Sequence, residues 1–299
     1  MSTWSVACLQ LDLAGESNLD RMEAEVAAVK RRMKWLDMVV LPELYAFGPR
    51  LAHAESPNGP AETRFREMAR RSQVWLLPGS FFQIENGRTC NVAPLIDPAG
   101  NIVSRYRKMF PFRPYEQGVT AGEEFCVVPI GGIATLGVSI CYDLWFPETT
   151  RSLTWLGAEA VICPTLTNTI DRDVELAMAR ANAAANQCYV ISVNSGAPLA
   201  MGRSIVCGPG GEVIHEAGSG CEVFAVELDF DYVARVRRRG WHGLGQPLKS
   251  FRDHPVQFPP YRPAERSPAL DALGPLTLPS TLRTPTMVPS IPNQDTHHE

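Results

Sequence analysis

The chain has 299 residues, and 45% of them are hydrophobic, which is enough for a sizeable core without disulfides or metals. The net charge of −4 is mild and favours neither nucleic acid nor an acidic membrane as the main partner. No apolar run reaches the length of about 18 residues that a spanning helix needs, and no basic stretch precedes the first apolar residues. The sequence therefore predicts neither a membrane anchor nor a secretory signal.

Along the first third of the chain, apolar periodicity alternates between strand and helix. A strand is predicted over residues 4–13 and a helix over 17–36, where apolar residues recur at steps of three and four. A short buried strand (37–43), a second helix (60–72) and another strand (74–82) follow.

From Cys90 onward, hairpins join this pattern. The predicted strands lie at 90–97, 101–110, 124–128, 133–141, 158–164, 188–194, 203–217 (as a hairpin) and 221–229. Helices are predicted from Pro147 to about Leu156 and over 173–187. The mixture of both connection types predicts an α/β fold in which helices flank more than one sheet layer.

The C-terminal region changes in character. The triplet Arg237-Arg238-Arg239 is interpreted as a solvated helix end. After about Pro259 the chain is rich in Pro, Ser and Thr without periodicity, so residues 259–299 are predicted to be a mostly disordered tail.

The eight cysteines are scattered through apolar segments without a CxxC pair. This favours reduced thiols in a cytoplasmic protein. The six histidines show no metal-binding spacing, so neither a metal site nor a cofactor is predicted.

Cys141 is unusual because it stands where a predicted strand ends and a helix soon begins. A nearby helix N-terminus would favour its thiolate, the form that attacks a carbonyl carbon. Taken alone, a packed core cysteine is the commoner outcome.

Three further charged residues follow strands or lie in a loop. Glu43 ends "VVLPE", where burial would raise its pKa and suit it to proton transfer. Lys108 follows a strand, where an ammonium group could stabilise negative charge on a carbonyl oxygen. Glu116 lies in a loop eight residues after Lys108. Singly, each is more often a surface charge. Together with Cys141 they supply a nucleophile, a proton carrier and an electrophilic stabiliser.

The motifs "LPE" at Glu43, "YRK" at Lys108 and "ICYDLWFPE" at Cys141 resemble, in order and spacing, the signature regions of the nitrilase superfamily, the carbon–nitrogen hydrolases. The resemblance covers residues 3–230. It implies a four-layer αββα sandwich and a single domain over 1–258, with a catalytic core at 3–230 and a packing extension at 231–258.

The resemblance also implies roles. Cys141 is similar to the family's nucleophile, Glu43 to its general base and Lys108 to its oxyanion stabiliser, while Glu116 is similar to a second glutamate that orients substrate and lysine. The backbone N–H of Tyr142 would share the oxyanion. Asp143 is interpreted as structural support.

The residues after the cysteine bear on the substrate. Tyr142-Asp143 looks like the amidase and carbamoylase branches, and Trp145 stands where ω-amide hydrolases commonly carry arginine; both Tyr142 and Trp145 are predicted to bind substrate. The leading prediction is a thiol amidohydrolase that releases ammonia from a small amide. The alternatives are an N-carbamoyl amine amidohydrolase, then a nitrilase, an acyl transferase or a non-catalytic scaffold.

The family associates through helix faces and C-terminal segments. We therefore expect a homodimer or higher homo-oligomer, in which residues 236–261 pack across a partner subunit.

Overall fold

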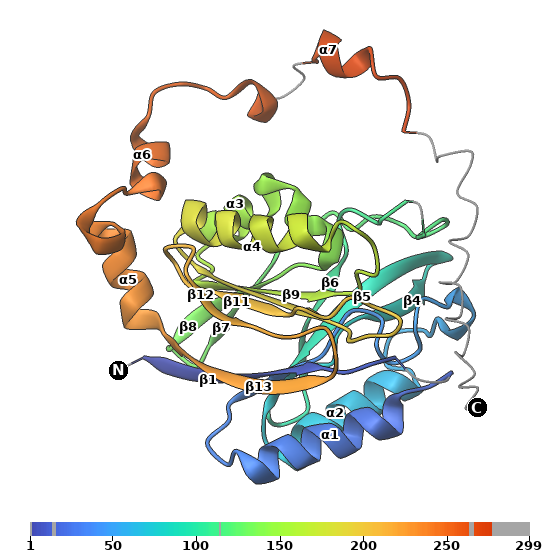
Figure 1. Ribbon diagram of the computed structural model, residues 1–299. Coiled ribbons are helices and arrows are strands. Elements are labelled where there is room, and N and C mark those ends of the chain that lie inside the picture. The colour runs from blue at the N-terminus through green and yellow to red at the C-terminus, as the bar shows by residue number, and fades with distance from the viewer. Residues whose placement is uncertain (1, 14–15, 114, 263–265, 277–299) are drawn as a thin grey trace, which may run out of the picture. The chain divides into compact units, whose positions relative to one another are not determined.

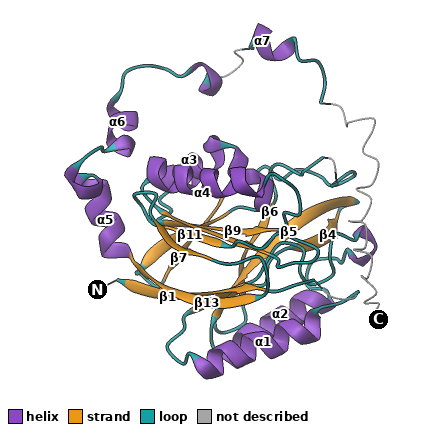
Figure 2. Ribbon diagram, viewed as in Figure 1, coloured by secondary structure: helices purple, strands orange, loops and turns teal. Residues whose placement is uncertain are grey.

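The computed structural model describes residues 2–13, 16–113, 115–262 and 266–276. The chain divides into two units, one formed by Met1–Pro111 with Gly118–Pro255 and the other by Phe112–Gln117 with Val256–Glu299. Within the described residues, every strand belongs to the first unit (Figure 2).

The first sheet has seven strands in the order β13-β1-β2-β3-β5-β4, with β6 paired to β5. Strands β1, β2 and β3 run parallel, whereas β13 lies antiparallel to β1 along its full length. The strands are β1 (Thr3–Gln10), β2 (Met38–Val40), β3 (Trp75–Leu77), β4 (Phe81–Glu85), β5 (Arg88–Ile96), β6 (Ile102–Arg107) and β13 (Glu222–Asp229).

The second sheet has six strands in the order β12-β11-β10-β9-β8-β7. Its centre, β8-β9-β10, is parallel, so the carboxyl ends of these strands meet at one edge. The strands are β7 (Cys126–Ile130), β8 (Ala134–Val138), β9 (Ala160–Thr165), β10 (Tyr189–Asn194), β11 (Ile205–Cys207) and β12 (Val213–Glu216).

Helices cover the outer face of each sheet in the first unit (Figure 1). The helices α1 (Leu19–Arg32) and α2 (Pro60–Ser72) lie against the first sheet, and α3 (Pro147–Trp155) and α4 (Arg172–Asn186) lie against the second. The helix α5 (Phe230–Arg239) follows β13 and leads towards α6 (Pro247–Asp253), which contacts α4. The predicted four-layer αββα sandwich is confirmed.

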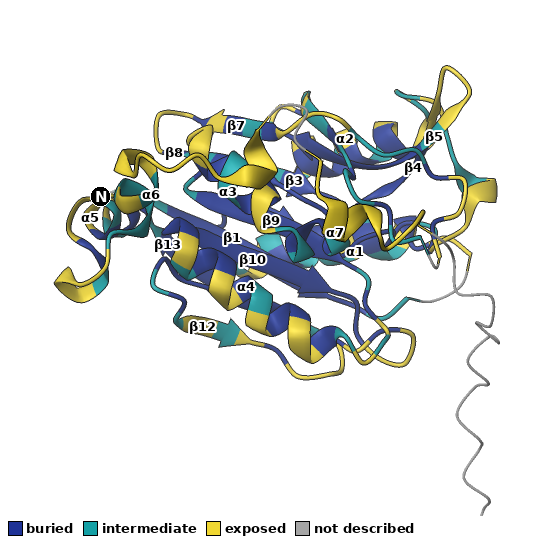
Figure 3. Ribbon diagram, turned by 90° about the horizontal axis from the view of Figure 1, so that it is seen from above, coloured by how far each residue is buried: buried dark blue, intermediate teal, exposed yellow. Residues whose placement is uncertain are grey.

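Three apolar clusters hold these layers together. The largest lies between the two sheets, a second between the first sheet and α1 and α2, and a third between the second sheet and α3 and α4. The central strands, such as β2 and β10, are buried along their length, while β12 and the outer helix surfaces are exposed, as Figure 3 shows. The periodic stripe predicted over 17–36 forms part of the second cluster, through Met22, Val26 and Val29.

The second unit is small. In its first segment, the rings of Phe112 and Tyr115 lie 5.6 Å apart. Two short helical turns, η4 (Pro259–Tyr261) and α7 (Pro268–Asp271), occupy the described part of the Pro-rich tail. Residues 277–299 lie outside the described residues, so the predicted disorder of this tail and the domain boundary at 258 stay predictions.

Two local predictions were wrong. The single strand expected over 74–82 is divided into β3 and β4, because Gly79 adopts a φ of +81° between them. Arg237 is half-buried: its guanidinium donates to the carbonyl oxygens of Gln187 and Ala158, and burial lowers its pKa. Only Arg238 and Arg239 form the exposed helix end that the sequence predicted.

In the described part of the chain, none of the helices combines the length and apolar content needed to cross a membrane.

The turn at Gly79 generates a prediction about the segment that carries Glu43. A side chain at Gly79 would overlap the carbonyl oxygen of Pro42, one residue before Glu43. We expect Gly79→Ala to lower the free energy of unfolding by more than about 3 kcal/mol, measured by urea denaturation. Gly87→Ala is the matched control, since Gly87 also has a positive φ (+73°) but open space around it, and it is expected to cost only about 1–2 kcal/mol. Equal costs for both variants would contradict the overlap.

Candidate active site

The predicted catalytic residues Glu43, Lys108 and Cys141 each follow a strand of the first unit. Glu43 comes three residues after β2, Lys108 directly after β6, and Cys141 three residues after β8. Two of these strands belong to the first sheet and one to the second. The site therefore depends on how the two sheets face each other.

Glu43 and Lys108 form a buried ion pair. The Lys108 Nζ lies 2.8 Å from Glu43 Oε1, and the two side chains are 2% and 3% exposed. The same oxygen accepts a hydrogen bond of 2.9 Å from the side-chain amide of Asn91 on β5. Charges this deeply buried require good geometry and further hydrogen bonds, and both are present here.

The end of β9 connects this ion pair to the second sheet. The backbone N–H of Leu166 donates to Glu43 Oε2 at 2.9 Å, and the N–H of Glu43 donates to the Thr165 carbonyl at 3.2 Å. The next residue, Thr167, lies with its Oγ1 3.9 Å from the Sγ of Cys141. One short segment thus contacts both the carboxylate and the thiol, which brings the three predicted residues to one place.

Cys141 opens the short helix η2 (Cys141–Trp145) in a strained backbone conformation. Its φ is +47°, a value that non-glycine residues rarely adopt and that costs about 1–3 kcal/mol. Such strain persists only where the surrounding contacts enforce it, and it is common at functional sites.

The burial of Cys141 opposes the thiolate that a nearby helix N-terminus would favour. Burial raises the pKa of its thiol well above the ordinary value, the Glu43 carboxylate adds to this, and the Lys108 ammonium acts in the opposite direction without offsetting it. Cys141 is therefore a neutral thiol at rest, and a base must remove its proton during any nucleophilic attack.

Asp143 fixes the turn that carries Cys141, as the sequence predicted. Its Oδ2 accepts hydrogen bonds from the Ile140 N–H at 2.9 Å and from the Tyr106 hydroxyl at 2.7 Å, and its Oδ1 accepts from the Phe110 N–H at 2.8 Å. Burial raises the pKa of Asp143 to about 6. Since Phe110 follows Lys108 by two residues, this one carboxylate ties the lysine segment to the cysteine turn.

The two predicted substrate-binding residues, Tyr142 and Trp145, are half-buried in η2. Their rings lie 5.9 Å apart, and Tyr142 also packs edge-on against Phe146 at 5.2 Å. The indole N–H of Trp145 lies 3.5 Å from an oxygen of Glu175 on α4. A role in substrate binding stays a prediction for both residues.

Glu116, the fourth predicted catalytic residue, belongs to the second unit. Its carboxylate accepts the backbone N–H of Phe112, in the same unit, at 2.6 Å. Its catalytic role stays a prediction.

Sequence reasoning missed four polar residues of the site: Asn91, Thr167, Arg172 and Glu175. Thr167 was detectable in principle, because it follows a buried strand in the same way as Glu43 does. Glu175 stands in the first turn of an Ala-rich helix, where a carboxylate is expected on electrostatic grounds alone, so nothing in the sequence marked it as part of the site.

The three hydrogen bonds to Asp143 generate a prediction. All three donors point at a carboxylate, so Asp143→Asn would place an amide N–H₂ against at least one of them. We expect the free energy of unfolding to fall by about 1–3 kcal/mol, measured by urea denaturation. Tyr106→Phe removes only one donor and leaves the carboxylate its two backbone partners, so a loss of about 1 kcal/mol is expected. A larger loss in Tyr106→Phe than in Asp143→Asn would contradict this account.

Comparison with known proteins places this chain in a family. The family model for carbon–nitrogen hydrolase matches residues 5–238. The 2-oxoglutaramate amidase of Bacillus subtilis is 27% identical over 244 residues, which cover 78% of this chain and 94% of that protein. An (R)-stereoselective amidase of Pseudomonas sp. is 32% identical over 213 residues, covering 68% and 76%.

A solved structure agrees with the sequence matches. The amidase from Nesterenkonia sp. superposes with a TM-score of 0.70 at 27% identity, covering 79% of this chain and 95% of that one. A variant of that amidase carries the acetamide moiety of fluoroacetamide, added covalently at the active site cysteine. Because the family match spans nearly all of the two-sheet core, this protein is a member of the carbon–nitrogen hydrolase family, within the nitrilase superfamily.

Proposed function

We propose that the protein is a thiol amidohydrolase that cleaves the C–N bond of a small linear amide at Cys141. The observation that carries the proposal is the buried Glu43–Lys108 ion pair, with Leu166 bound to its carboxylate and the adjacent Thr167 touching the cysteine sulfur. A carboxylate, an ammonium group and a thiol enclosed together are the groups that acyl transfer requires.

In the first half of the reaction, Glu43 acts as general base. It accepts the proton of the neutral Cys141 thiol as the sulfur attacks the amide carbon. The Lys108 ammonium and the backbone N–H of Tyr142 stabilise the negative charge that develops on the carbonyl oxygen, and each such donor contributes on the order of 10²–10³ in rate. The tetrahedral adduct then collapses, the C–N bond breaks, and Glu43 returns its proton to the departing nitrogen as ammonia forms.

The second half regenerates the thiol. Glu43 takes a proton from a water molecule that attacks the thioester, the C–S bond breaks, and the sulfur recovers the proton. One amide and one water are thereby converted to a carboxylic acid and ammonia. We assign Glu116 the orienting role that the family resemblance implies.

The names of the relatives support an amide substrate, since both curated proteins described above are amidases. An N-carbamoyl amine is the second candidate, favoured by the sequence Leu-Trp-Phe-Pro-Glu around Trp145, which is similar to that of carbamoylputrescine amidases. Ammonia release from a panel of primary amides, ureido compounds and nitriles separates these substrate classes. Turnover of a nitrile with no ammonia from any amide would refute the amidase assignment.

Substitutions in the triad test the mechanism. We expect Cys141→Ala to abolish ammonia release, because no nucleophile remains, and Glu43→Gln to lower turnover by about 10²–10⁴-fold, because the base is lost. Circular dichroism checks that both variants fold. Cys188→Ala is the matched control. Cys188 is also a buried thiol, but it directly precedes the amino end of β10, whereas the site lies at the carboxyl ends of the strands. This variant is expected to retain turnover. Normal turnover in Cys141→Ala would exclude the thioester route.

The thioester itself is open to direct detection. We expect a trapped acyl group to appear, by mass spectrometry, on the peptide that contains Cys141. The exposed thiol of Cys221 is the internal comparison, because simple accessibility would direct a non-specific acylating reagent there.

We also propose a cytoplasmic homo-oligomer. All eight cysteines, each within the described residues, are free thiols, which fits a reducing compartment. Large apolar side chains are exposed at the end of α3, where Trp155 is 64% and Leu156 is 52% exposed, and the Trp155 ring packs against Phe251 of α6. Neighbouring exposed apolar groups, unlike single scattered ones, are typical of an interface.

Light scattering tests this assembly. We expect the mass of a dimer or higher oligomer for the natural chain and a shift towards monomer for Trp155→Glu, because a buried charge would oppose association. Trp35→Glu, at a tryptophan that is 58% exposed beyond the end of α1, is expected to leave the mass unchanged. A monomeric natural chain would contradict the proposal.

A further inference from the structure

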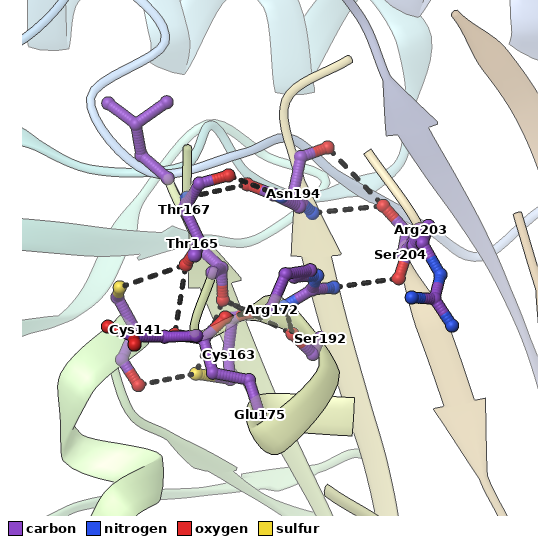
Figure 4. A network of polar contacts seen from close by, with 12 residues as sticks. Cys141, Cys163, Thr165, Thr167, Arg172, Glu175, Ser192, Asn194, Arg203 and Ser204 are labelled. Carbon is purple, nitrogen blue, oxygen red and sulfur yellow. Dashed lines mark hydrogen bonds and ion pairs between the residues drawn. The ribbon is translucent and has the colours of Figure 1, made fainter. Parts of the chain in front are cut away.

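A second set of polar residues lies beside Cys141, on the side of β9 and α4 (Figure 4). The Oγ1 of Thr167 is 3.9 Å from the Cys141 sulfur and donates a hydrogen bond of 2.9 Å to Glu175 Oε1. All three residues are buried. The thiol is thus connected through one hydroxyl group to a carboxylate that the mechanism above does not use.

The direction of these contacts follows from hydrogen count. A hydroxyl group has one proton, and an ionised carboxylate can only accept, so the proton of Thr167 is committed to Glu175. The Thr167 oxygen is left to face the sulfur as an acceptor. It therefore holds the S–H of Cys141 by a weak contact and restricts where the sulfur can lie.

Glu175 is itself fixed by Arg172. The Arg172 guanidinium lies 3.0 Å from Glu175 Oε2, and both side chains are almost fully buried. The guanidinium also donates to the carbonyl oxygens of Gly202 at 3.1 Å and Arg203 at 2.8 Å. The charge of the carboxylate is balanced, and its position does not depend on the thiol.

Thr167 is also fixed through its backbone. Its N–H donates to the side-chain oxygen of Asn194 at 2.9 Å, and its carbonyl accepts from the amide group of the same residue at 3.1 Å. Hydrogen bonds thus fix both the backbone of Thr167 and its hydroxyl group. A rigidly held neighbour of this kind is what accurate placement of a reacting atom requires.

We infer that Thr167 is a positioning residue for the Cys141 nucleophile, and that Glu175 and Arg172 act through it by fixing its hydroxyl group. The inference rests on the proposed function, in which the Cys141 sulfur attacks an amide carbon. It assigns these residues no contact with the reacting atoms of the substrate.

An electrostatic consequence accompanies the geometry. The charged groups that act on the thiol are the carboxylates of Glu43 and Glu175 and the ammonium of Lys108, and both carboxylates raise the pKa of the Cys141 thiol. The buried carboxylate of Asp143 stands two residues along the chain. Neutralising Glu175 alone is therefore expected to make the thiolate easier to form.

Removal of the Thr167 hydroxyl tests the positioning role. We expect Thr167→Val to lower kcat about 10- to 100-fold with KM changed less than about threefold, because a misplaced sulfur slows attack without weakening substrate binding. Thr167→Ser restores the hydroxyl and is expected to recover most of kcat. Thr167→Ala removes the hydroxyl group without placing a methyl group against Glu175. If the valine variant does not fold, the kcat of the alanine variant tests the positioning role instead.

Thr154→Val is the matched control. Thr154 and Thr167 are both 6% exposed, but the Thr154 hydroxyl donates to the Thr150 carbonyl within α3 and is not in contact with Cys141. Its kcat is expected to equal that of the natural chain. Natural kcat in Thr167→Val or in Thr167→Ala, or failure of Thr167→Ser to recover kcat in a folded protein, would overturn the inference.

Alkylation by iodoacetamide tests Glu175 without relying on turnover. The rate at Cys141, resolved from Cys221 by the mass of each peptide, is expected to be about threefold or more higher in Glu175→Gln than in the natural chain from about pH 8 to 10. Glu62→Gln is the control, since Glu62 is a buried carboxylate paired with Arg105 on the first sheet.

An unchanged or slower rate in Glu175→Gln would overturn the electrostatic effect on the Cys141 thiol that is assigned to Glu175. Because alkylation needs no amide substrate, this result stands even if no amide is hydrolysed. Absence of turnover in the natural chain would instead refute the proposed function, so the two failures are distinguishable.

Discussion

The site depends on one interaction, the buried ion pair between Glu43 and Lys108. Two opposite charges removed from water are stable only when their geometry is good and their remaining hydrogen-bonding atoms have partners. Here the partners come from both sheets: Asn91 belongs to the first, and the Leu166 N–H follows β9 of the second. The requirement to satisfy one carboxylate therefore fixes how the two sheets meet at the edge where Cys141 lies.

The same charges bear on the protonation of the Cys141 thiol. Around Cys141, Glu43 is balanced by Lys108 and Glu175 by Arg172. A thiolate would add another buried negative charge, one without a partner, which burial opposes. In the proposed mechanism, proton transfer to Glu43 and attack on the substrate are therefore coupled, and the negative charge moves to the carbonyl oxygen, where Lys108 can stabilise it.

Much of the fold was predictable because its causes are local. Apolar residues that recur at steps of three and four define α1. Alternating strand patterns separated by turn residues define the hairpin of β5 and β6. The errors came where distant segments meet. The predicted strand over 74–82 breaks because Gly79 must pass close to Pro42, and Arg237 is half-buried because the carbonyl oxygens of Ala158 and Gln187 face it.

By itself, the sequence determined the strand ends that carry Glu43, Lys108 and Cys141. Apolar runs and the residues that end them are local features, so they can be recognised without the fold. It also determined the family, because those three motifs keep their order and spacing. Only the tertiary structure decided the protonation of Cys141 and the presence of Thr167, Glu175 and Arg172 beside it. Burial and charge proximity act across segments that are far apart in the chain, so no local pattern encodes them.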